Sequence, residues 1–411
     1  MKFKQGDPCI YCNGKVYRKK PLRTIRFFAQ PPIQAKISEY ERYRCNLCGA
    51  TFLPDIPEEA KGEKYDESAI AMIAILKYGF GIPFYRLENL QDCLETPLSS
   101  STQWDKAELG ADKIHRVYNQ LITEAAQGEI VHNDDTPVKI LELVKENENP
   151  EIDKKRKGMQ TTGILSIKED IKIALFFSGR NHSGENLADL MEKRDSGREP
   201  PIQMCDALPA NSSDYKDIIL ANCNSHARRK FVYEVDNYPD ECNHVLDIFG
   251  ELYKNDAYTK KLGMSFQERL EYHQEHSGPL MDSFHEWLTE QFEQKRVEPN
   301  SGMGQAISYV TTHWEELTRF LHVPGVPLDN NLCEQALKRA ILHRKNSMFF
   351  KTCHGANVGD IYMSLIHTCV LNKVNPFNYL VELMRHTSEV FAHPDQWMPW
   401  NYLEIVSQEA A

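Results

Sequence analysis

Three acidic residues stand at positions that suit metal-dependent chemistry on phosphodiesters. Asp134 closes an apolar segment that begins at residue 129, and Asp206 follows the apolar segment 202–205. Glu334 stands where a helix is expected to begin. Cutting or joining DNA requires an attacking oxygen to be activated and a leaving oxygen to be stabilised, and two Mg²⁺ or Mn²⁺ ions held by carboxylates do both. We therefore predict that these three acids are catalytic and bind metal; solvated acids at strand and helix ends are the alternative.

Two neighbouring acids compete for these assignments. Asp135 adjoins Asp134, and Asp329 lies just before the helix of Glu334. Successive side chains of a strand point to opposite faces, so only one of Asp134 and Asp135 can face the metals, and we choose Asp134. The interval between the second and third acids is the longer one, so a helical insertion, expected over 227–320, must separate them.

Four N-terminal cysteines are spaced as ligands of one structural zinc ion. The pairs are Cys9 with Cys12 and Cys45 with Cys48. Each Cys-x-x-Cys pair lets two sulfurs converge, and two such pairs complete a tetrahedral site. The long interval between the pairs favours a zinc ribbon with an inserted hairpin. Such a module either recognises DNA or a partner, or serves only as a structural staple.

A second cluster combines a cysteine, a histidine and basic residues. Cys223 and His226 form a Cys-x-x-His pair without an evident partner pair. We expect them to pack or hydrogen-bond beside the metal site, with metal binding as the alternative. Basic residues after this pair and after Glu334 are expected to contact DNA phosphates, unless they form solvated helix faces. The predicted DNA-binding residues are Arg228, Arg229, Lys230, Lys338, Arg339, Arg344, Lys345 and Asn346.

The order of the apolar segments predicts the sheet that would position the acids. The expected segments are a strand over 129–134 that continues over 138–141, a loop over 145–158, strands over 162–167 and 171–177, a helix over 183–193, a strand over 202–205, a helical turn and a strand over 218–221. This is the chain order of the ribonuclease-H fold. Adjacent strand ends would bring Asp134 and Asp206 together, and a helix crossing the sheet would present Glu334.

The predicted class is therefore α/β: a ribonuclease-H-like catalytic core with a large helical insertion, preceded by a small zinc ribbon and a helical segment. Three helices of that segment outline a helix-turn-helix, with a plain helical linker as the alternative. The expected divisions are 1–53 for the zinc module, 54–127 for the helix-turn-helix-like DNA-binding segment, 128–231 for the first part of the core, 232–326 for the insertion, 327–386 for the Glu334 helix and a C-terminal helix, and 387–411 for the tail.

Composition narrows the class of protein. The chain has 411 residues, is 41% hydrophobic and 26% charged, and contains no apolar run long enough for a membrane helix. With no export signal behind Met1, we expect a reduced, cytoplasmic and nucleoid-associated protein. The net charge is −11, yet residues 1–50 hold eleven Lys and Arg against three acids, so DNA contact must use this basic end and local patches.

Several stretches carry a resemblance to a known family. They are Asp134–Val138, Cys223–Phe231, Asp329–Glu334, Arg344–Asn346, Tyr362–Ile366, Asn375–Leu380 and Trp397–Asn401. Together with the preceding zinc module they resemble, from about residue 6 to residue 402, the bacterial transposases of the insertion-sequence-sixty-six family. The resemblance implies an Asp-Asp-Glu transposase with Asp134, Asp206 and Glu334 at the catalytic positions. It implies nicking at the ends of an element, then attack of the new 3′-hydroxyl on target DNA.

Some features depart from the pattern of this family. Only eight residues precede Cys9, whereas the family usually has a longer helical leader. Residues 207–211 replace the glycine and aromatic residues that commonly follow the second acid. Gln335 and Lys338 replace arginines, and Ser347 replaces a tryptophan. Because all three acids are present, we expect a divergent but intact active site.

The resemblance also implies partners. These are DNA, as element ends and target, a second copy of the chain when assembled on DNA, and small accessory proteins of the same element. Two other activities remain as alternatives: a transposase-derived DNA-binding protein that does not cut, and a ribonuclease-H-like nuclease that acts on structured DNA or RNA. Binding without metal-dependent nicking would identify the first, and cleavage without strand transfer the second.

Overall fold

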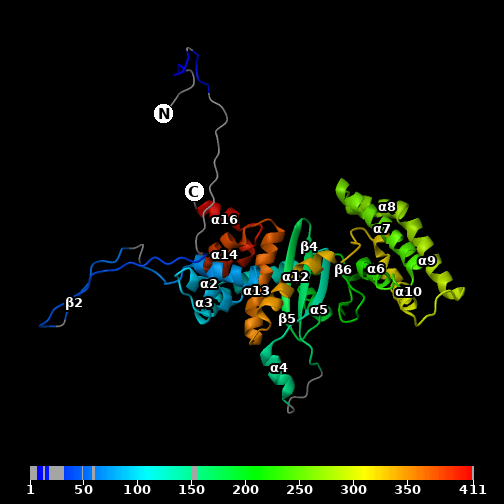
Figure 1. Cartoon of the computed structure of the whole chain (residues 1–411), viewed down its shortest axis with the longest axis horizontal. Helices are drawn as coiled ribbons and strands as arrows, with labels where there is room; N and C mark the ends of the chain where they lie inside the picture. Colours follow the sequence, from blue (N-terminus) through cyan, green and yellow to red (C-terminus); the bar gives the residue numbers. More distant parts are fainter. Residues whose placement is uncertain are drawn as a thin grey trace.

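The computed structural model describes residues 7–12, 14–17, 32–48, 50–57, 61–149 and 156–409. Figure 1 shows a central sheet with helices packed around it. Near the N-terminus, β1 (Tyr43–Arg44) and β2 (Thr51–Phe52) pair as a small antiparallel hairpin. In the described part of the chain, no helix combines the length and the apolar character needed to cross a membrane.

A five-stranded mixed sheet forms the centre of the protein, in the order β5-β4-β3-β6-β7. The strands are β3 (Ile130–Pro137), β4 (Gln160–Lys168), β5 (Ile171–Gly179), β6 (Ile202–Cys205) and β7 (Ile219–Asn222). Strands β3, β4 and β5 pair antiparallel, whereas β6 and β7 run parallel to β3. These segments are rich in apolar and β-branched residues that are buried on both faces, which favours strands in the middle of a fold. The predicted α/β class is confirmed.

Helices cover both faces of this sheet. They are α3 (Ser100–Ala125), α5 (Ser183–Met191) and α12 (Asn331–Ser347). Helix α12 crosses β3 and β4, and Gly163 permits this approach because a Cβ there would lie 2.8 Å from Leu337 Cδ2. Helices α3 and α5 pack on the other face, where the Ser166 hydroxyl donates to Ala125 O at 2.6 Å. Since Gly163 pairs directly with Asp134, the two share a face, and Asp134 points toward α12.

Helix α13 (Cys353–Leu371) covers the open edge of β5. The bonds run from Ser178 N to Asp360 Oδ2 (2.7 Å), from Phe176 N to Ser364 Oγ (2.9 Å) and from Ala174 N to Thr368 Oγ1 (3.0 Å). An uncovered edge strand exposes N–H groups that can pair with other chains. Side chains of α13 therefore accept hydrogen bonds from the backbone N–H groups of β5 that a sixth strand would otherwise bind.

Three helical segments precede the sheet, as predicted. Helix α1 (Glu67–Ala74) continues into the π-helical turn η2 (Ile75–Gly79), and α2 (Phe84–Cys93) follows. Helix α3 begins after Ser99, whose side chain accepts from Thr102 N. It is 26 residues long, because its buried stripe packs against α1, α13 and the sheet. The role of this segment as a helix-turn-helix that binds DNA stays a prediction.

The predicted helical insertion lies between β7 and α12. Its elements are α6 (Asn224–Val232), α7 (Pro239–Leu262), α8 (Phe266–His276), α9 (Gly278–Glu293), α10 (Gly302–Thr312), α11 (Trp314–Leu317) and η3 (Arg319–Leu321). These helices share a hydrophobic core with buried residues of β3, β6 and β7, and Phe231, Phe249 and Phe284 are fully buried in it. Trp287 and Trp314 pack against it while partly exposed.

Three segments differ from the prediction. The strand ends at Pro137, because proline cannot donate to the sheet, and α4 (Leu141–Glu148) occupies part of the predicted loop 145–158. Residues 206–218 form a loop where a helical turn was expected. The one C-terminal helix expected before residue 386 is broken by a turn. Asn375 then caps a new helix, and the C-terminal elements are α14 (Pro376–Arg385), α15 (Thr387–Ala392), η4 (Pro394–Trp397) and α16 (Tyr402–Glu409).

Candidate active site

Asp134 lies near the C-terminal end of β3 and is half-buried. Its Oδ1 accepts hydrogen bonds from Asp135 N at 2.8 Å and from Asn211 Nδ2 at 3.3 Å. Burial is the main cause that raises the pKa of Asp134 to about 7. The hydrogen bond from Asp135 N–H lowers this pKa, and the negative charges of Asp206 and Glu334 raise it. A carboxyl group in such surroundings readily takes up a proton or a cation near neutral pH.

Asp206 follows β6 and is connected to Asp134 by Asn211. The Asn211 amide donates to Oδ1 of both acids, and Leu208 N donates to Asp206 Oδ1 at 3.2 Å. Asn211 is 2% exposed, and its own Oδ1 accepts from Ser183 Oγ at 2.7 Å. Because that bond fixes the orientation of the amide, its N–H groups must face the acids. The loop after β6 therefore holds the first two acids together.

Glu334 lies in the first turn of α12, and Asn330 fixes the start of that helix against β3. Asn330 is fully buried. Its Nδ2 donates to Asn133 O at 3.0 Å, and its Oδ1 lies 3.0 Å from His132 Nδ1. Its backbone N–H donates to Cys223 Sγ at 3.2 Å. These contacts bring the helix that carries Glu334 to the strand that carries Asp134.

His226 and Arg229 of α6 face Glu334. His226 Nε2 lies 3.7 Å from Glu334 Oε1, and Arg229 Nη2 lies 3.8 Å from Oε2. Ligand atoms of Cys223, His226 and Glu334 all lie within 4.8 Å of one another. Burial lowers the pKa of His226, which Asp206 and Glu334 partly offset, and burial raises the pKa of Cys223 to about 11. The structure thus places Cys223 and His226 beside the acids; their supporting role stays a prediction.

The donors at this site fit a hard divalent cation. Asp134 and Asp206 form no ion pair with a lysine or arginine among the described residues. Glu334 Oε1 is buried and has no hydrogen-bond partner in the described part of the chain. Crowded acids and an unpartnered buried oxygen are both stabilised by Mg²⁺ or Mn²⁺, which prefer carboxylate ligands. The assignment of Asp134, Asp206 and Glu334 as ligands of such ions stays a prediction.

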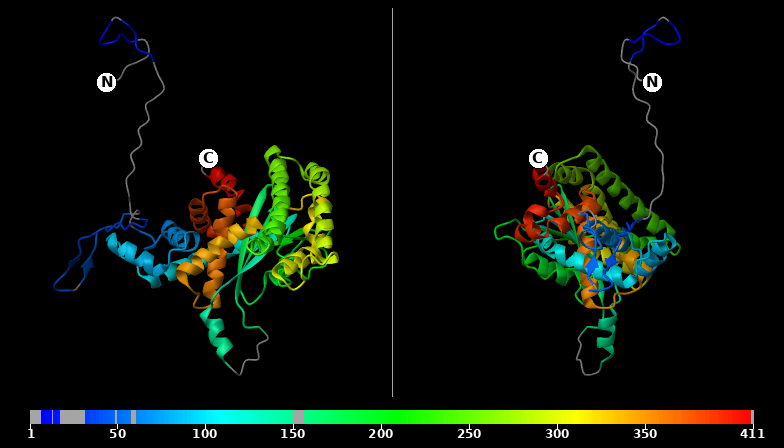
Figure 2. Two further views of the ribbon diagram at one scale, coloured as in Figure 1. Left: turned by 45° about the vertical axis from the view of Figure 1, so that its right-hand side comes forward. Right: turned by 90° about the vertical axis from the view of Figure 1, so that its left-hand side faces the viewer.

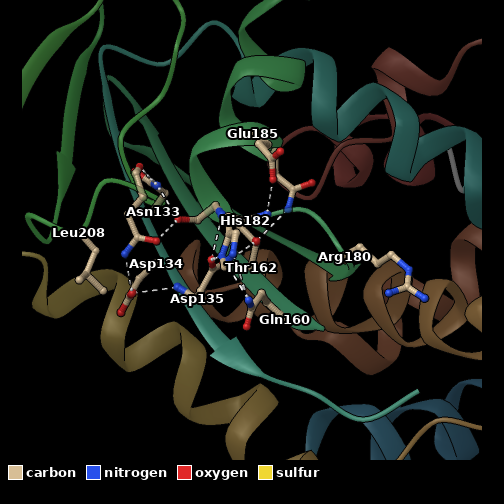
Figure 3. A network of polar contacts seen from close by, with 12 residues as sticks. Asn133, Asp134, Asp135, Gln160, Thr162, Arg180, His182, Glu185 and Leu208 are labelled. Atoms are coloured by element: carbon tan, nitrogen blue, oxygen red, sulfur yellow. Dashed lines mark hydrogen bonds and ion pairs between the residues drawn. The ribbon is translucent and has the colours of Figure 1, made fainter. Parts of the chain in front are cut away.

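Asp135 points to the opposite side of β3 and has its own partners (Figure 3). It accepts from Thr162 Oγ1 at 2.6 Å and from Ser183 N at 3.0 Å, and lies 3.0 Å from His182 Nδ1. These contacts attach the beginning of α5 to the sheet. Asp135 therefore has a structural role, which supports Asp134 as the acid of the site.

The predicted DNA-binding residues of α6 surround one side of the acids. Arg228, Arg229 and Lys230 are all exposed. Lys230 Nζ lies 5.0 Å from the centre of the Tyr309 ring, and Arg229 approaches Glu334. This cluster is accessible to a phosphate backbone, and its contact with DNA stays a prediction.

The predicted DNA-binding residues of α12 have different environments. Lys338 and Lys345 are exposed, while Arg339, Arg344 and Asn346 are partly buried. Arg344 donates to hydroxyl and carbonyl oxygens at the end of β3, so it also supports the sheet. Burial lowers the pKa of Arg339. The two exposed lysines are the residues of this helix best placed to meet DNA.

The two N-terminal cysteine pairs form separate tight turns. Cys9 N donates to Gly14 O at 2.7 Å, and Cys45 N donates to Ala50 O at 2.8 Å. Residues 7–12 and 14–17 lie apart from β1 and β2 in every view of Figures 1 and 2. Among the described residues, the four sulfurs do not gather into one cluster. The structure does not bring the pairs together, and the four-cysteine zinc site stays a prediction.

Two important residues escaped the sequence reasoning. Asn211 and Asn330 carry no titratable group, and asparagines are common in loops and at helix starts. Asn330 stands directly before the helix of Glu334 and within the Asp329–Glu334 stretch of the family resemblance, but neither signal assigned it a role. Asn211 is recognised only once the loop is seen to fold back onto Asp134.

Comparison with known proteins finds a matching family and several relatives of this chain. The profile of a family described as "Transposase IS66 family" matches residues 62–358. Three proteins of Sinorhizobium fredii, each described as uncharacterized, are similar to this chain. The protein y4hP is 26% identical over 96% of this chain and 73% of its own length. The protein y4jD is 22% identical over 97% and 78%, and y4qI is 25% identical over 82% and 62%.

Proposed function

This chain belongs to the IS66 family of transposases, and on that premise we propose that it cuts DNA at the ends of an insertion sequence and joins them to target DNA. The observation that carries the proposal is that the charges of Asp206 and Glu334 both act on Asp134 near the end of β3. Asn211 donates to both Asp134 and Asp206, and the charge of Glu334 acts on Asp134. Family membership supports transposase activity in general, and these contacts support the proposed cleavage and joining of DNA.

The arrangement of the sheet supports a ribonuclease-H-like core. The first strand in the chain, β3, lies at the centre of the sheet, between the antiparallel pair and the parallel pair. Its end therefore adjoins β6, the strand that leads into Asp206. Helix α12 then crosses β3 and β4 and presents Glu334. This is the placement that the ribonuclease-H order predicts for the three acids.

Asp134, Asp206 and Glu334 would hold Mg²⁺ or Mn²⁺. Two such ions supply activation of the attacking water or 3′-hydroxyl and stabilisation of the leaving oxygen. The protein's own part is to keep the carboxylates in place through Asn211 and the start of α12 through Asn330. Preorganised groups of this kind lower the barrier because they need not rearrange during the reaction.

Basic residues near the acids suit the binding of DNA. Arg228 and Lys230 on α6 and Lys338 and Lys345 on α12 are exposed. Lysine and arginine contacts to phosphates position DNA without reading its sequence. We propose that the element ends are recognised by the N-terminal zinc module and the α1–α3 segment. A second copy of the chain and small accessory proteins of the element would complete the assembly.

A nicking assay tests this function. Purified full-length protein is incubated with Mg²⁺ or Mn²⁺ and labelled DNA that carries the ends of its own element. Glu334→Gln is the test variant, and Asp282→Asn, which changes an exposed acid on α9, is the matched control. We expect wild type and the control to nick the element ends and Glu334→Gln to bind the same DNA without nicking it.

Other outcomes would point to other functions. Binding by wild type without nicking, with and without accessory proteins, would indicate a DNA-binding protein that has lost cleavage. Nicking that ignores the element ends and yields no joined product would indicate a nuclease. Nicking that survives in Glu334→Gln would overturn the assignment of the third acid.

A further inference from the structure

The helix that carries Glu334 ends in a strained turn. Phe349 N donates to Ser347 O at 2.7 Å, which closes a three-residue γ-turn around Met348. Met348 has φ 62° and ψ −39°, in a region that residues with side chains rarely adopt. Such strain costs folding free energy, and it persists where neighbouring structure enforces it, often at binding or catalytic sites.

Contacts on both sides hold this turn in place. Lys77 Nζ donates to Ser347 Oγ at 2.6 Å. Phe350 N donates to Lys139 O at 2.9 Å, and the Phe350 ring stacks on His343 with a centroid distance of 5.0 Å. The turn is therefore a fixed feature between α12 and the segment that follows β3.

The turn presents apolar side chains to solvent. Met348 is 70% exposed and Phe349 is 40% exposed. Phe80 and Leu342 are also exposed, and a Cβ on Gly81 would lie 3.4 Å from Leu342 Cγ, so the loop of Phe80 adjoins the same helix. Single exposed apolar residues are common. Here, a strained backbone holds two of them outward at the end of a helix.

Positive charge surrounds these apolar side chains. Glu334, Lys338 and Lys345 are four and eleven residues apart, so they share one face of α12 within about 40°. Lys338 and Lys345 are exposed, as are Lys139 and Lys351 on either side of the Phe350 contact. In a chain of net charge −11, this local excess of lysines suits a polyanion. The lysine face runs from the acids to the turn.

We propose that the Ser347–Phe349 turn is a wedge that inserts Met348 and Phe349 between base pairs of the DNA that lies along α12. Proteins that bend DNA insert Met and Phe side chains in this way, next to basic residues that hold the backbone. Met348 follows Glu334 by fourteen residues of helix, or about 21 Å, which corresponds to about six base pairs of duplex. The wedge would therefore unstack a base step about six pairs from the cut. The inference rests on the proposed function, because the occupant is its DNA substrate.

A fluorescent adenine analogue placed at one position at a time in an element-end duplex tests the wedge. Full-length Glu334→Gln protein is used so that the bound DNA stays uncut. We expect fluorescence to rise several-fold at a step about six pairs from the nick and nowhere else. The rise should vanish when Phe349→Ala or Met348→Gly is added. Leu262→Ala, at another exposed apolar residue, is the control and should keep it. Glycine tolerates the positive φ of Met348, so this variant keeps the fold.

Mismatched DNA provides a second arm. In protein that retains Glu334, Phe349→Ala should nick paired ends about tenfold more slowly. A mismatch at the wedge step should restore the rate, because the base step is already unstacked. Unchanged fluorescence at every position, or an equal rise in the variants, would overturn the wedge even if nicking occurs. If wild type never nicks but the rise is seen and depends on Phe349, the cleavage proposal fails and the wedge stands.

Discussion

A buried carboxylate in the helical insertion and a half-buried one in the sheet have opposite surroundings. Asp256 of α7 lies 2.6 Å from Arg269, 2.7 Å from Lys260 and 3.6 Å from His273. Burial raises its pKa, but these partners together bring the pKa of Asp256 well below its usual range. Asp134 faces other acids and an amide, and its pKa is raised to about 7.

The difference separates a structural acid from a functional one. In the insertion, the partners of Asp256 come from α7 and α8 themselves, so this carboxylate is neutralised by the folded chain alone. Near the end of β3, no lysine or arginine among the described residues forms an ion pair with Asp134. Strongly perturbed acids without counter-charges are typical of sites that bind metal or substrate. We therefore propose that the same residue type stabilises one region and binds a ligand in the other.

The largest effect that we expect is the loss of nicking activity when Asp134 is replaced. Asp134→Asn should lower the nicking rate by on the order of a thousandfold, because a residue that acts within the reacting site is removed. Asp256→Asn should leave the rate per folded molecule close to that of wild type. Single-turnover nicking, normalised to the folded fraction from circular dichroism, measures both. An equal loss in the two variants would break the distinction.

For folding stability, we expect Asp256→Asn to have the large effect. Asp256→Asn leaves Arg269 and Lys260 without their carboxylate, and breaking such a buried pair costs about 3 kcal/mol. The unfolding midpoint of the insertion in urea should therefore fall clearly. Asp247→Asn, at an exposed position of the same helix, is the matched control and should change little. If both variants unfold alike, the Asp256 cluster contributes nothing to stability.

The sequence predicted the acids better than it predicted their supports. Apolar segments led to Asp134, which lies within β3, and to Asp206, which directly follows β6. The strand period separates Asp134 from Asp135 without any coordinates. Asn211 could not be predicted, because its contact with Asp134 depends on how the loop after β6 folds back. The end of β3 at Pro137 was readable in principle, since proline cannot extend a sheet, yet the apolar residues that follow it favoured a longer strand.

Two features depend on long-range contacts that the sequence pattern does not predict: the turn at Met348 and the approach of the two cysteine pairs. Nothing in the letters Ser347–Phe349 indicates a positive φ at Met348, which tertiary contacts from Lys77 and Phe350 impose. The spacing of Cys9 and Cys45 with their partners predicts zinc strongly, but spacing within a pair says nothing about how two distant turns approach. Local sequence patterns therefore predict the chemistry of a side chain better than its position relative to distant parts of the chain.

The pH dependence of stability sharpens the comparison further. Because the folded pKa of Asp134 lies near 7 and the unfolded value near 4, its stabilising contribution is complete below about pH 4 and is lost as the pH rises through about 7. Metal-free Asp134→Asn should therefore be more stable than metal-free wild type at pH 8, by about 2 kcal/mol after allowing for partial exposure. The difference should disappear toward pH 4. Urea unfolding at several pH values in the presence of a chelator measures it, and a variant less stable at pH 8 would contradict the account.

Asn211 makes the smallest and most specific test. Arginine and lysine neutralise the charge of Asp256. The Asn211 amide, in contrast, positions the carboxylates of Asp134 and Asp206 without neutralising them. Asn211→Ala should raise the Mg²⁺ concentration needed for half-maximal nicking by about tenfold, as expected for a group that orients metal ligands. Saturating Mn²⁺ should recover most of the rate, because the three acids remain. Ser183→Ala, which removes only the bond that orients the amide, should shift the Mg²⁺ requirement in the same direction but less. A lower maximal rate with an unchanged Mg²⁺ requirement would mean that Asn211 supports only the loop, and that the acids at the end of β3 keep their positions without it.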